Sequence, residues 1–279
     1  MLRDILGGQK GDFAHDFGIE QKLAEECMDN NTIKSAVKEK YGEIARVSSS
    51  CCKPGCGCGT DSSVADTIIL RDLYEGADKQ IRDVADLGLG CGTPTAFAEL
   101  AEGMTVLDLG SGAGIDVFVA AKLIGPGGRA IGVDMTEQMI SRAEANREKL
   151  GVENAEFRYG EIESLPVETG SVDRVISNCV INLVPDKRAA FSEIFRVLKA
   201  GGKFTVSDIV SVGQIPEKLR NDMLQWAGCV AGALDKDDYL AIVREVGFID
   251  LKIAAEKPYQ LDSSLPFGLR SITLTATKP

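Results

Sequence analysis

The stretch that decides the fold is MTVLDLGSGAGIDVFVAAKLIGPGG, residues 104–128. It begins with an apolar run typical of a buried strand, passes through Gly110, Gly112 and Gly114, and continues as an apolar helix that ends at a Gly/Pro stop. Glycines let the backbone turn tightly and approach a ligand, and the start of a helix offers unpaired N–H groups. The pattern therefore predicts a strand–turn–helix unit that binds a nucleotide.

An acidic residue at the end of the next apolar run strengthens this prediction. The segment RAIGVD ends in Asp134, about 20 residues after Gly114, the separation at which a carboxylate accepts hydrogen bonds from a ribose. The alternative is a structural turn plus an unrelated surface acid. Both features at the expected spacing favour the binding site, so we expect Asp134 to contact a ribose.

Short apolar runs alternate with amphipathic helical segments from Met104 to Val210. Strands and helices in turn are typical of βαβ units on a parallel sheet. An insertion rich in helix formers follows at about residues 211–235, then a helix, and then strand candidates at 250–255 and 271–278. We expect an α/β, Rossmann-like sheet that is mostly parallel and has an antiparallel hairpin at its edge.

The chain divides into three predicted parts. Residues 1–65 are a small appendage, Cys-rich in places, with one helical run at 32–47. Residues 66–103 are an arm that carries Cys91, and residues 104–279 are the cofactor-binding domain with its substrate-covering insertion.

Composition limits the functions that the chain can have. Its 279 residues contain no run near the roughly 18 consecutive apolar residues of a membrane span, and the charged N-terminus is unlike a signal peptide. We therefore expect a cytoplasmic protein with no membrane partner. A net charge of −11 disfavours nucleic acid as a partner. Because cytoplasmic thiols stay reduced, the eight Cys indicate metal-binding, catalytic or core thiols rather than disulfides.

A second glycine-rich stretch, DLGLGCGTPT at residues 86–95, looks like the first but lacks its context. The preceding segment KQIRDVA is too charged for a buried parallel strand, and no acidic residue ends an apolar strand about 20 residues later. We therefore expect Asp86 to Gly92 not to hold the nucleotide.

The form D-x-G-x-G-x-G of the first loop resembles motif I of class I S-adenosylmethionine methyltransferases. The segments GVDMTEQMISRAEAN, GEIESLP, SVDRVISN and EIFRVLKAGGKF are similar to the later motifs of that class. The resemblance implies the class I methyltransferase fold and S-adenosylmethionine as cofactor. The cofactor-binding residues that it implies are Asp108, Gly110, Ser111, Gly112, Gly114, Asp134, Met135, Glu161, Ile162 and Asn178. For Glu161 and Asn178, the capping of a turn is the alternative role.

The cysteines indicate what is methylated. The single His, His15, lies in the appendage, so a His base is not expected. Cys179 directly follows the fourth strand, Cys229 lies in the insertion, and Cys91 lies in the second glycine loop. Three thiolates above one cofactor suit a soft, thiophilic centre. Zinc usually shows C-x-x-C pairs, whereas a trivalent arsenical takes three sulfur ligands and attacks a methyl group through its own lone pair.

The sequence resembles the arsenite S-adenosylmethionine methyltransferase family in three segments. These are GLGCGTPTAFAELAEGMTVLDLGSGAGID, SNCVINLVPDK and GCVAGA. The resemblance implies that Cys179 and Cys229 bind arsenic, that Cys91 is the third thiol, and that arsenite and methylarsenite are the substrates. The second glycine loop would then be a flexible arm that carries a thiol to the metalloid.

The resemblance also implies a redox partnership between Cys91 and an N-terminal Cys. Cys51 or Cys52 is the preferred partner, with thioredoxin or glutathione as the reductant. Cys56 and Cys58 are interpreted as a metalloid buffer or part of a mobile tail. The first thirty residues depart from the family pattern.

Two other functions stay open at this point. A class I methyltransferase for a carbon or oxygen acceptor, such as a quinone or sterol, would not need the thiols. A non-enzymatic Cys-rich protein that binds metalloids would not need a methyl donor. Cys179 as a small buried hydrophobe, Cys229 as a packing residue beside Trp226, and the N-terminal cysteines as a zinc knuckle are the corresponding structural roles.

Overall fold

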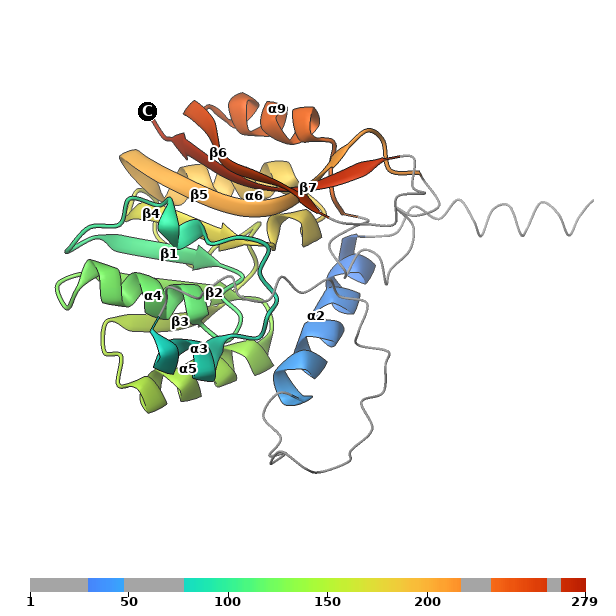
Figure 1. Ribbon diagram of the computed structural model, residues 1–279. Helices are drawn as coiled ribbons and strands as arrows, with labels where there is room; N and C mark the ends of the chain where they lie inside the picture. Colours follow the sequence, from blue (N-terminus) through green and yellow to red (C-terminus); the bar gives the residue numbers. More distant parts are fainter. Residues whose placement is uncertain (1–29, 48–77, 217–231, 260–266) are drawn as a thin grey trace, which may run out of the picture.

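The computed structural model describes residues 30–47, 78–216, 232–259 and 267–279. In this part of the chain, seven strands form one sheet in the order β3-β2-β1-β4-β5-β7-β6 (Figure 1). The strands are β1 Thr105–Leu109, β2 Arg129–Asp134, β3 Ala155–Tyr159, β4 Val172–Asn178, β5 Leu198–Val212, β6 Ile249–Tyr259 and β7 Gly268–Thr277. The helices are α2 Asn30–Val47, α3 Lys79–Ala85, α4 Ile115–Ile124, α5 Glu137–Leu150, α6 Lys187–Val197 and α9 Lys236–Val246, with short 3₁₀ turns η2 Pro94–Ala96 and η3 Ile181–Leu183.

Strands β1 to β5 run parallel, whereas β7 runs antiparallel to both β5 and β6. The predicted mostly parallel sheet with an antiparallel pair at its edge is therefore confirmed. The charged segment before the second glycine loop forms α3, in agreement with its exclusion as a strand. Most of the predicted insertion at about 211–235 lies outside the described residues.

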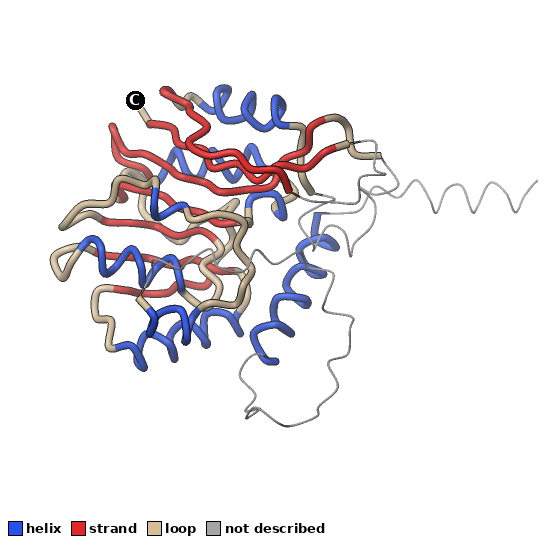
Figure 2. Tube along the Cα trace, viewed as in Figure 1, coloured by secondary structure: helices blue, strands red, loops and turns tan. Residues whose placement is uncertain are grey.

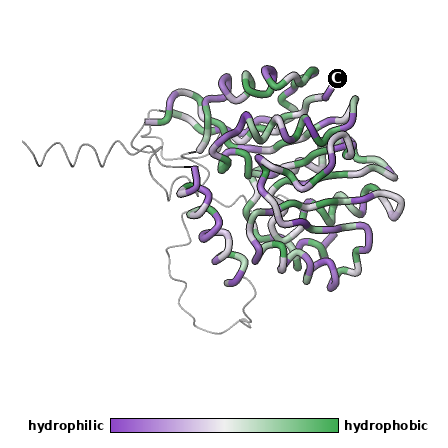
Figure 3. The backbone as a smooth tube through the Cα atoms, turned by 180° about the vertical axis from the view of Figure 1, so that it is seen from behind, coloured by the Kyte–Doolittle hydropathy of each residue, from purple (hydrophilic) through white to green (hydrophobic). Residues whose placement is uncertain are grey.

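The sheet separates two apolar layers because side chains alternate along each strand. In β1, Val106 packs with α3 and α4, whereas Leu107 packs with α6 and α9 on the opposite face. Helices α3, α4 and α5 thus cover one face, and α6 and α9 cover the other (Figures 1 and 2). Hydrophobic stretches are concentrated in the sheet, and many outer helical turns are hydrophilic (Figure 3).

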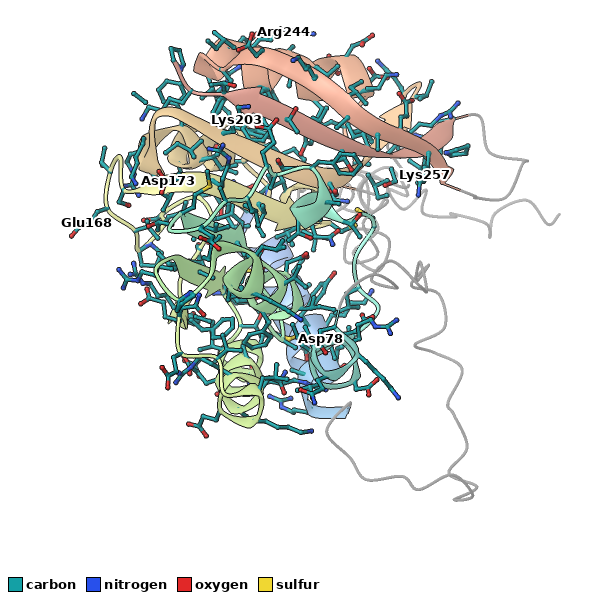
Figure 4. The ribbon with its side chains drawn as sticks, turned by 60° about the vertical axis from the view of Figure 1, so that its left-hand side comes forward. Asp78, Glu168, Asp173, Lys203, Arg244 and Lys257 are labelled. Atoms are coloured by element: carbon teal, nitrogen blue, oxygen red, sulfur yellow. The ribbon has the colours of Figure 1, made fainter. Side chains whose placement is uncertain are left out.

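Ion pairs connect elements at the amino ends of the strands. The Asp173 carboxylate accepts hydrogen bonds from Lys199 Nζ at 2.8 Å and from the Thr105 N–H at 2.9 Å, which joins the starts of β4, β5 and β1. Lys203 pairs with Glu99 at 2.7 Å. Figure 4 shows Asp173 and Lys203 on the outside of the molecule. Such exposed pairs contribute about 0–1 kcal/mol each to the stability of the fold. They lie at the end of the sheet opposite the carboxyl ends of the parallel strands.

Helix α2 stands beside the carboxyl ends of the parallel strands and packs on α5 (Figure 1). It agrees with the predicted helical run at 32–47. Its buried Ile33 and Val37 join the apolar cluster that also contains Cys91 and Cys179. In the described segments, no helix has both the length and the apolar character that a membrane span needs.

Candidate functional site

A cavity opens at the carboxyl ends of β1, β2 and β4, where the strand order reverses. Five segments wall it: α2, the second glycine loop, the turn after β1, the end of β2 with the residues after β3, and the residues after β4. Of the residues predicted to bind the cofactor, those that line the cavity are Asp108, Gly110, Ser111, Gly112, Asp134, Met135, Ile162 and Asn178.

The turn after β1 needs glycines because of its left-handed backbone conformation and because a side chain at Gly110 would clash with a neighbour. Gly110 and Gly112 have φ values of +64° and +52°, in the left-handed region that side chains disfavour. A Cβ at Gly110 would lie 2.5 Å from Val180, whereas a Cβ at Gly112 would meet no atom within 4 Å. The backbone at Gly112 therefore faces open space, which suits a ligand that lies directly on it. Gly114 does not line the cavity; it caps α4 with φ +95°.

Asp134 fixes this turn from the end of β2. Its carboxylate accepts the Gly112 N–H at 3.0 Å and the Thr136 N–H at 2.8 Å. Burial raises the pKa of Asp134, and the two backbone hydrogen bonds oppose that rise. The carboxylate thus holds the glycine turn and also presents acceptor oxygens to the cavity.

Five acidic residues line the cavity: Asp86, Asp108, Asp116, Asp134 and Glu163. Asp108 and Asp116 are buried, and both line the cavity together with Asp134. Burial raises the pKa of Asp108 strongly, and the nearby Asp116 and Asp134 raise it further. Among the described residues, Lys34 is the one basic side chain that lines the cavity. This electrostatic environment suits a positively charged ligand, and S-adenosylmethionine carries a sulfonium and an ammonium group.

Glu161 forms ion pairs with α2, and its contact with the cofactor stays a prediction. Its carboxylate pairs with Lys34 at 2.7 Å and Lys38 at 3.2 Å, both on α2, and it does not line the cavity. The hydrogen bond from Lys34 is the main cause that lowers the pKa of Glu161. Lys34 also pairs with Glu163 at 3.0 Å. These ion pairs hold α2 across the cavity, where Val37 also contributes to the lining.

The second glycine loop forms one wall of the cavity. As predicted, it does not form a strand–helix turn. Asp86, Leu87 and Gly90 nevertheless line the same cavity as the first loop. The expected flexible arm is instead hydrogen-bonded to the sheet: the Asn178 side chain accepts the Cys91 N–H at 3.0 Å, and Ser271 Oγ donates to the Cys91 carbonyl at 2.7 Å. The sequence did not predict that this loop lines the cavity, because the loop lacks a preceding strand.

The two thiols that the structure describes lie in one apolar cluster. Cys91 and Cys179 are 4% and 6% exposed, and they share this cluster with Ile209 and Leu269. Cys179 also lines the cavity and has a φ of +61°, a conformation uncommon for a residue with a side chain. The other predicted thiols, Cys51, Cys52, Cys56, Cys58 and Cys229, lie outside the described residues. Within the described ranges, no three His, Cys, Asp or Glu side chains form a metal-binding group.

A buried polar network supports the turn after Cys179. Asp208 in β5 is fully buried and accepts a hydrogen bond from the Tyr239 hydroxyl at 3.0 Å. Lys187 Nζ donates to the carbonyls of Asn182 and Val184 at 3.2 and 3.0 Å. Burial and the Asp208 carboxylate raise the pKa of Tyr239, and the thiols of Cys91 and Cys179 add to the rise. Tyr239 therefore stays a neutral donor beneath the thiol pair.

Comparison with known proteins identifies the family. A model described as a methyltransferase domain matches residues 100–247. The arsenite methyltransferase of Halobacterium salinarum is 43% identical over 266 residues, which is 90% of this chain and 68% of that protein. The chain belongs to the arsenite methyltransferase family.

Further members agree with this placement. The arsenite methyltransferase of Mus musculus is 35% identical over 79% of this chain and 59% of its own length. The crystal structure of an arsenic(III) S-adenosylmethionine methyltransferase from Chlamydomonas reinhardtii is 38% identical, with a TM-score of 0.64 over 74% of this chain and 72% of that chain. These family members thus extend beyond the region that this chain matches.

The buried Asp208 generates a prediction about pH. Burial raises its pKa to about 7, against the opposing effects of the Tyr239 hydroxyl and Lys187. Because the unfolded-state pKa is near 3.8, the folded state binds the proton more tightly, and wild-type stability falls as pH rises between about 4 and 7. An amide cannot ionise, so Asp208→Asn should gain stability relative to wild type over that window, as measured by thermal unfolding at a series of pH values.

Asp173→Asn is the matched control. Burial would raise the pKa of Asp173, but hydrogen bonds from Lys199 and Thr105 outweigh it and keep the pKa below its usual value. Asp173 is therefore ionised in both the folded and the unfolded state above about pH 5. The stability difference between this variant and wild type should stay constant above that pH. A constant difference for Asp208→Asn as well would show that Asp208 is ionised throughout.

Proposed function

We propose that this protein methylates trivalent arsenic with S-adenosylmethionine as the methyl donor. The observation that carries the proposal is that Cys91 and Cys179, two buried thiols from distant parts of the chain, share one apolar cluster, and that Cys179 lines an acidic cavity at the carboxyl end of the sheet. An acceptor with carbon or oxygen chemistry gives no reason for such a pair. Family membership supports the same conclusion.

The residues of the cavity fit the cofactor. The exposed backbone at Gly112 and the carboxylates of Asp108 and Asp134 would hold its polar groups, while Met135 and Ile162 offer apolar surface. When bound, the cofactor supplies an electrophilic methyl group on a sulfonium. Lys34 and Lys38 stay paired with glutamates, so α2 closes the cavity while the charges of these two lysines are balanced.

The thiols would hold the arsenic. Each thiol that binds arsenite replaces one hydroxide, which leaves as water with the thiol proton, so three thiols convert arsenite to a pyramidal tris-thiolate. Cys91 and Cys179 supply two of these ligands, and we assign the third to Cys229. The arsenic keeps its lone pair in this state and attacks the methyl carbon directly. No protein base is required for the transfer.

The reaction formally raises arsenic to the pentavalent state, and the N-terminal thiols would reverse this. The thiol of Cys51 or Cys52 would attack the arsenic-bound sulfur of Cys91, so that an S–S bond forms, the As–S bond breaks and one proton is released; the electron pair of the broken bond stays on arsenic and returns it to the trivalent state. Thioredoxin or glutathione would then reduce the disulfide. In the same account, the protein works where thiols are kept reduced, in the cytoplasm.

A change at Asp134 tests the cofactor site. Asp134→Ala removes acceptors for the ribose and for the Gly112 N–H, and it should weaken S-adenosylmethionine binding by about 1–3 kcal/mol, as measured by calorimetry. Glu168→Ala is the control, because Glu168 is exposed and points away from the molecule (Figure 4). Equal affinities for wild type and Asp134→Ala would remove Asp134 from the site.

Methylation assays on two substrates test the thiols. Arsenite has three exchangeable oxygens and methylarsenite has two, so the two substrates need different numbers of thiols. With S-adenosylmethionine and a small thiol as reductant, Cys179→Ser and Cys229→Ser should lose methylation of both substrates, whereas Cys91→Ser should lose arsenite methylation and keep methylarsenite methylation. Product analysis by chromatography and mass spectrometry gives the readout. Methylation of arsenite by Cys179→Ser at the wild-type rate would contradict the proposed function.

A further inference from the structure

We infer that Asn178 is a positioning residue for the Cys91 thiol, and that the glycines on both sides of Cys91 exist to let its loop reach Asn178. The inference rests on the proposed function for the role of the thiol itself. It gives Asn178 a different role from the cofactor contact that the sequence predicts.

The Asn178 side-chain amide forms hydrogen bonds with the backbone of Cys91 and Gly92. Its Oδ1 accepts the N–H groups of Cys91 and Gly92 at 3.0 and 3.2 Å. Its Nδ2 donates to the Gly92 carbonyl at 2.8 Å. The acceptor and the donor of one side-chain amide thus both bond to two consecutive residues of a loop that lies 86 positions away in sequence. No charged or hydroxyl side chain reproduces this pattern, because it needs an acceptor and a donor on one planar group.

The flanking glycines allow this close approach. A Cβ at Gly90 would lie 2.7 Å from Asn178 Nδ2, and a Cβ at Gly92 would lie 2.4 Å from Ser207 Oγ and 2.6 Å from Ser207 Cβ. Neither glycine has a φ in the left-handed region, so the requirement is for space and not for backbone conformation. This explains why the second loop resembles a nucleotide-binding loop: both loops need glycine for close packing of backbone, but on different partners.

Two neighbouring strands, β5 and β7, hold the backbone of both thiol residues. The Cys179 N–H donates to the Ser207 carbonyl at 2.7 Å, and Ser271 Oγ donates to the Cys91 carbonyl at 2.7 Å. Cys179 follows Asn178 directly in sequence. Asn178 therefore ties the Cys91 loop to the residue next to the second thiol, and a shift of the amide would change the separation between the two thiols.

Asn178 also touches the wall of the cofactor cavity. Its Nδ2 donates to Asp116 Oδ2 at 3.2 Å, and Asp116 lies in the first turn of α4. A loss of activity in an Asn178 variant would by itself not separate a thiol-positioning role from a cofactor role. The separation comes from the different number of thiols that the two arsenical substrates need.

The first experiment compares Asn178→Ala with Cys91→Ser in the full-length protein. Removal of the amide leaves the N–H groups of Cys91 and Gly92 without their acceptor, so the loop should shift. For Asn178→Ala, kcat/KM with arsenite should fall about tenfold or more relative to kcat/KM with methylarsenite, the rough size expected for lost hydrogen bonds in the loop. Arsenite binding without cofactor, followed by calorimetry, should weaken in the same variant by a larger factor than S-adenosylmethionine binding does.

The second experiment uses the glycine. Gly90→Ala places a methyl group against the Asn178 amide and should show the same preference for methylarsenite. If the methyl group acts by displacing that amide, the double variant Gly90→Ala with Asn178→Ala should be no worse than Asn178→Ala alone. Gly127→Ala is the matched control, because a Cβ there meets no atom within 4 Å. Thermal unfolding of each variant checks that the fold is kept.

The outcomes separate this inference from the proposed function. If Cys91→Ser itself affects both arsenicals equally, the assignment of the third thiol fails, and with it the inference. If Cys91→Ser shows the difference between substrates but Asn178→Ala affects both equally and weakens cofactor binding, then Asn178 is a cofactor residue and only the inference is overturned. Independent, additive losses from Gly90→Ala and Asn178→Ala would also overturn it.

Discussion

Strands β1 and β4 are neighbours in the sheet, but the chain leaves β1 toward one face and leaves β4 toward the other. The site depends on the gap between these two diverging connections. After β1 the chain turns through Gly110 and Gly112 into α4, and after β4 it turns through Cys179 into η3 and α6. The cavity lies between these two turns. In the proposed function, one turn would offer backbone to the cofactor and the other would offer a thiol to the metalloid, so the geometry of the sheet would bring methyl donor and acceptor together.

Acidic side chains outnumber basic ones around this gap. Asp108, Asp116 and Asp134 face the cavity, while Lys34 and Lys38 of α2 are paired with glutamates. On the other side of the thiol pair, Asp208 is hydrogen-bonded to Tyr239 and lies near Lys187. Burying several carboxylates close together is unfavourable, so their presence around an open cavity is best explained by a cationic ligand that offsets the cost.

Sequence alone predicted the parts of the site that depend on local pattern. The glycine turn at Gly110, Asp134 at the end of β2, and Cys179 after β4 could each be placed, because a parallel sheet brings the carboxyl ends of its strands to one edge. The side-chain partners of Glu161 and Asn178 could not be predicted, since they come from segments more than 80 positions away. The packing of the second glycine loop could not be predicted for the same reason: its glycines pack against Asn178 and Ser207, which no local pattern reveals.

The central claim is that Cys91 and Cys179, brought together at the end of β4, bind trivalent arsenic with a third thiol. X-ray absorption at the arsenic edge tests it most directly, on full-length protein with one equivalent of arsenite and no cofactor. The account predicts that arsenic has three sulfur neighbours in the wild type, and two sulfur neighbours with one oxygen in Cys91→Ser. Three sulfur neighbours in both proteins, or oxygen neighbours alone in the wild type, would contradict it.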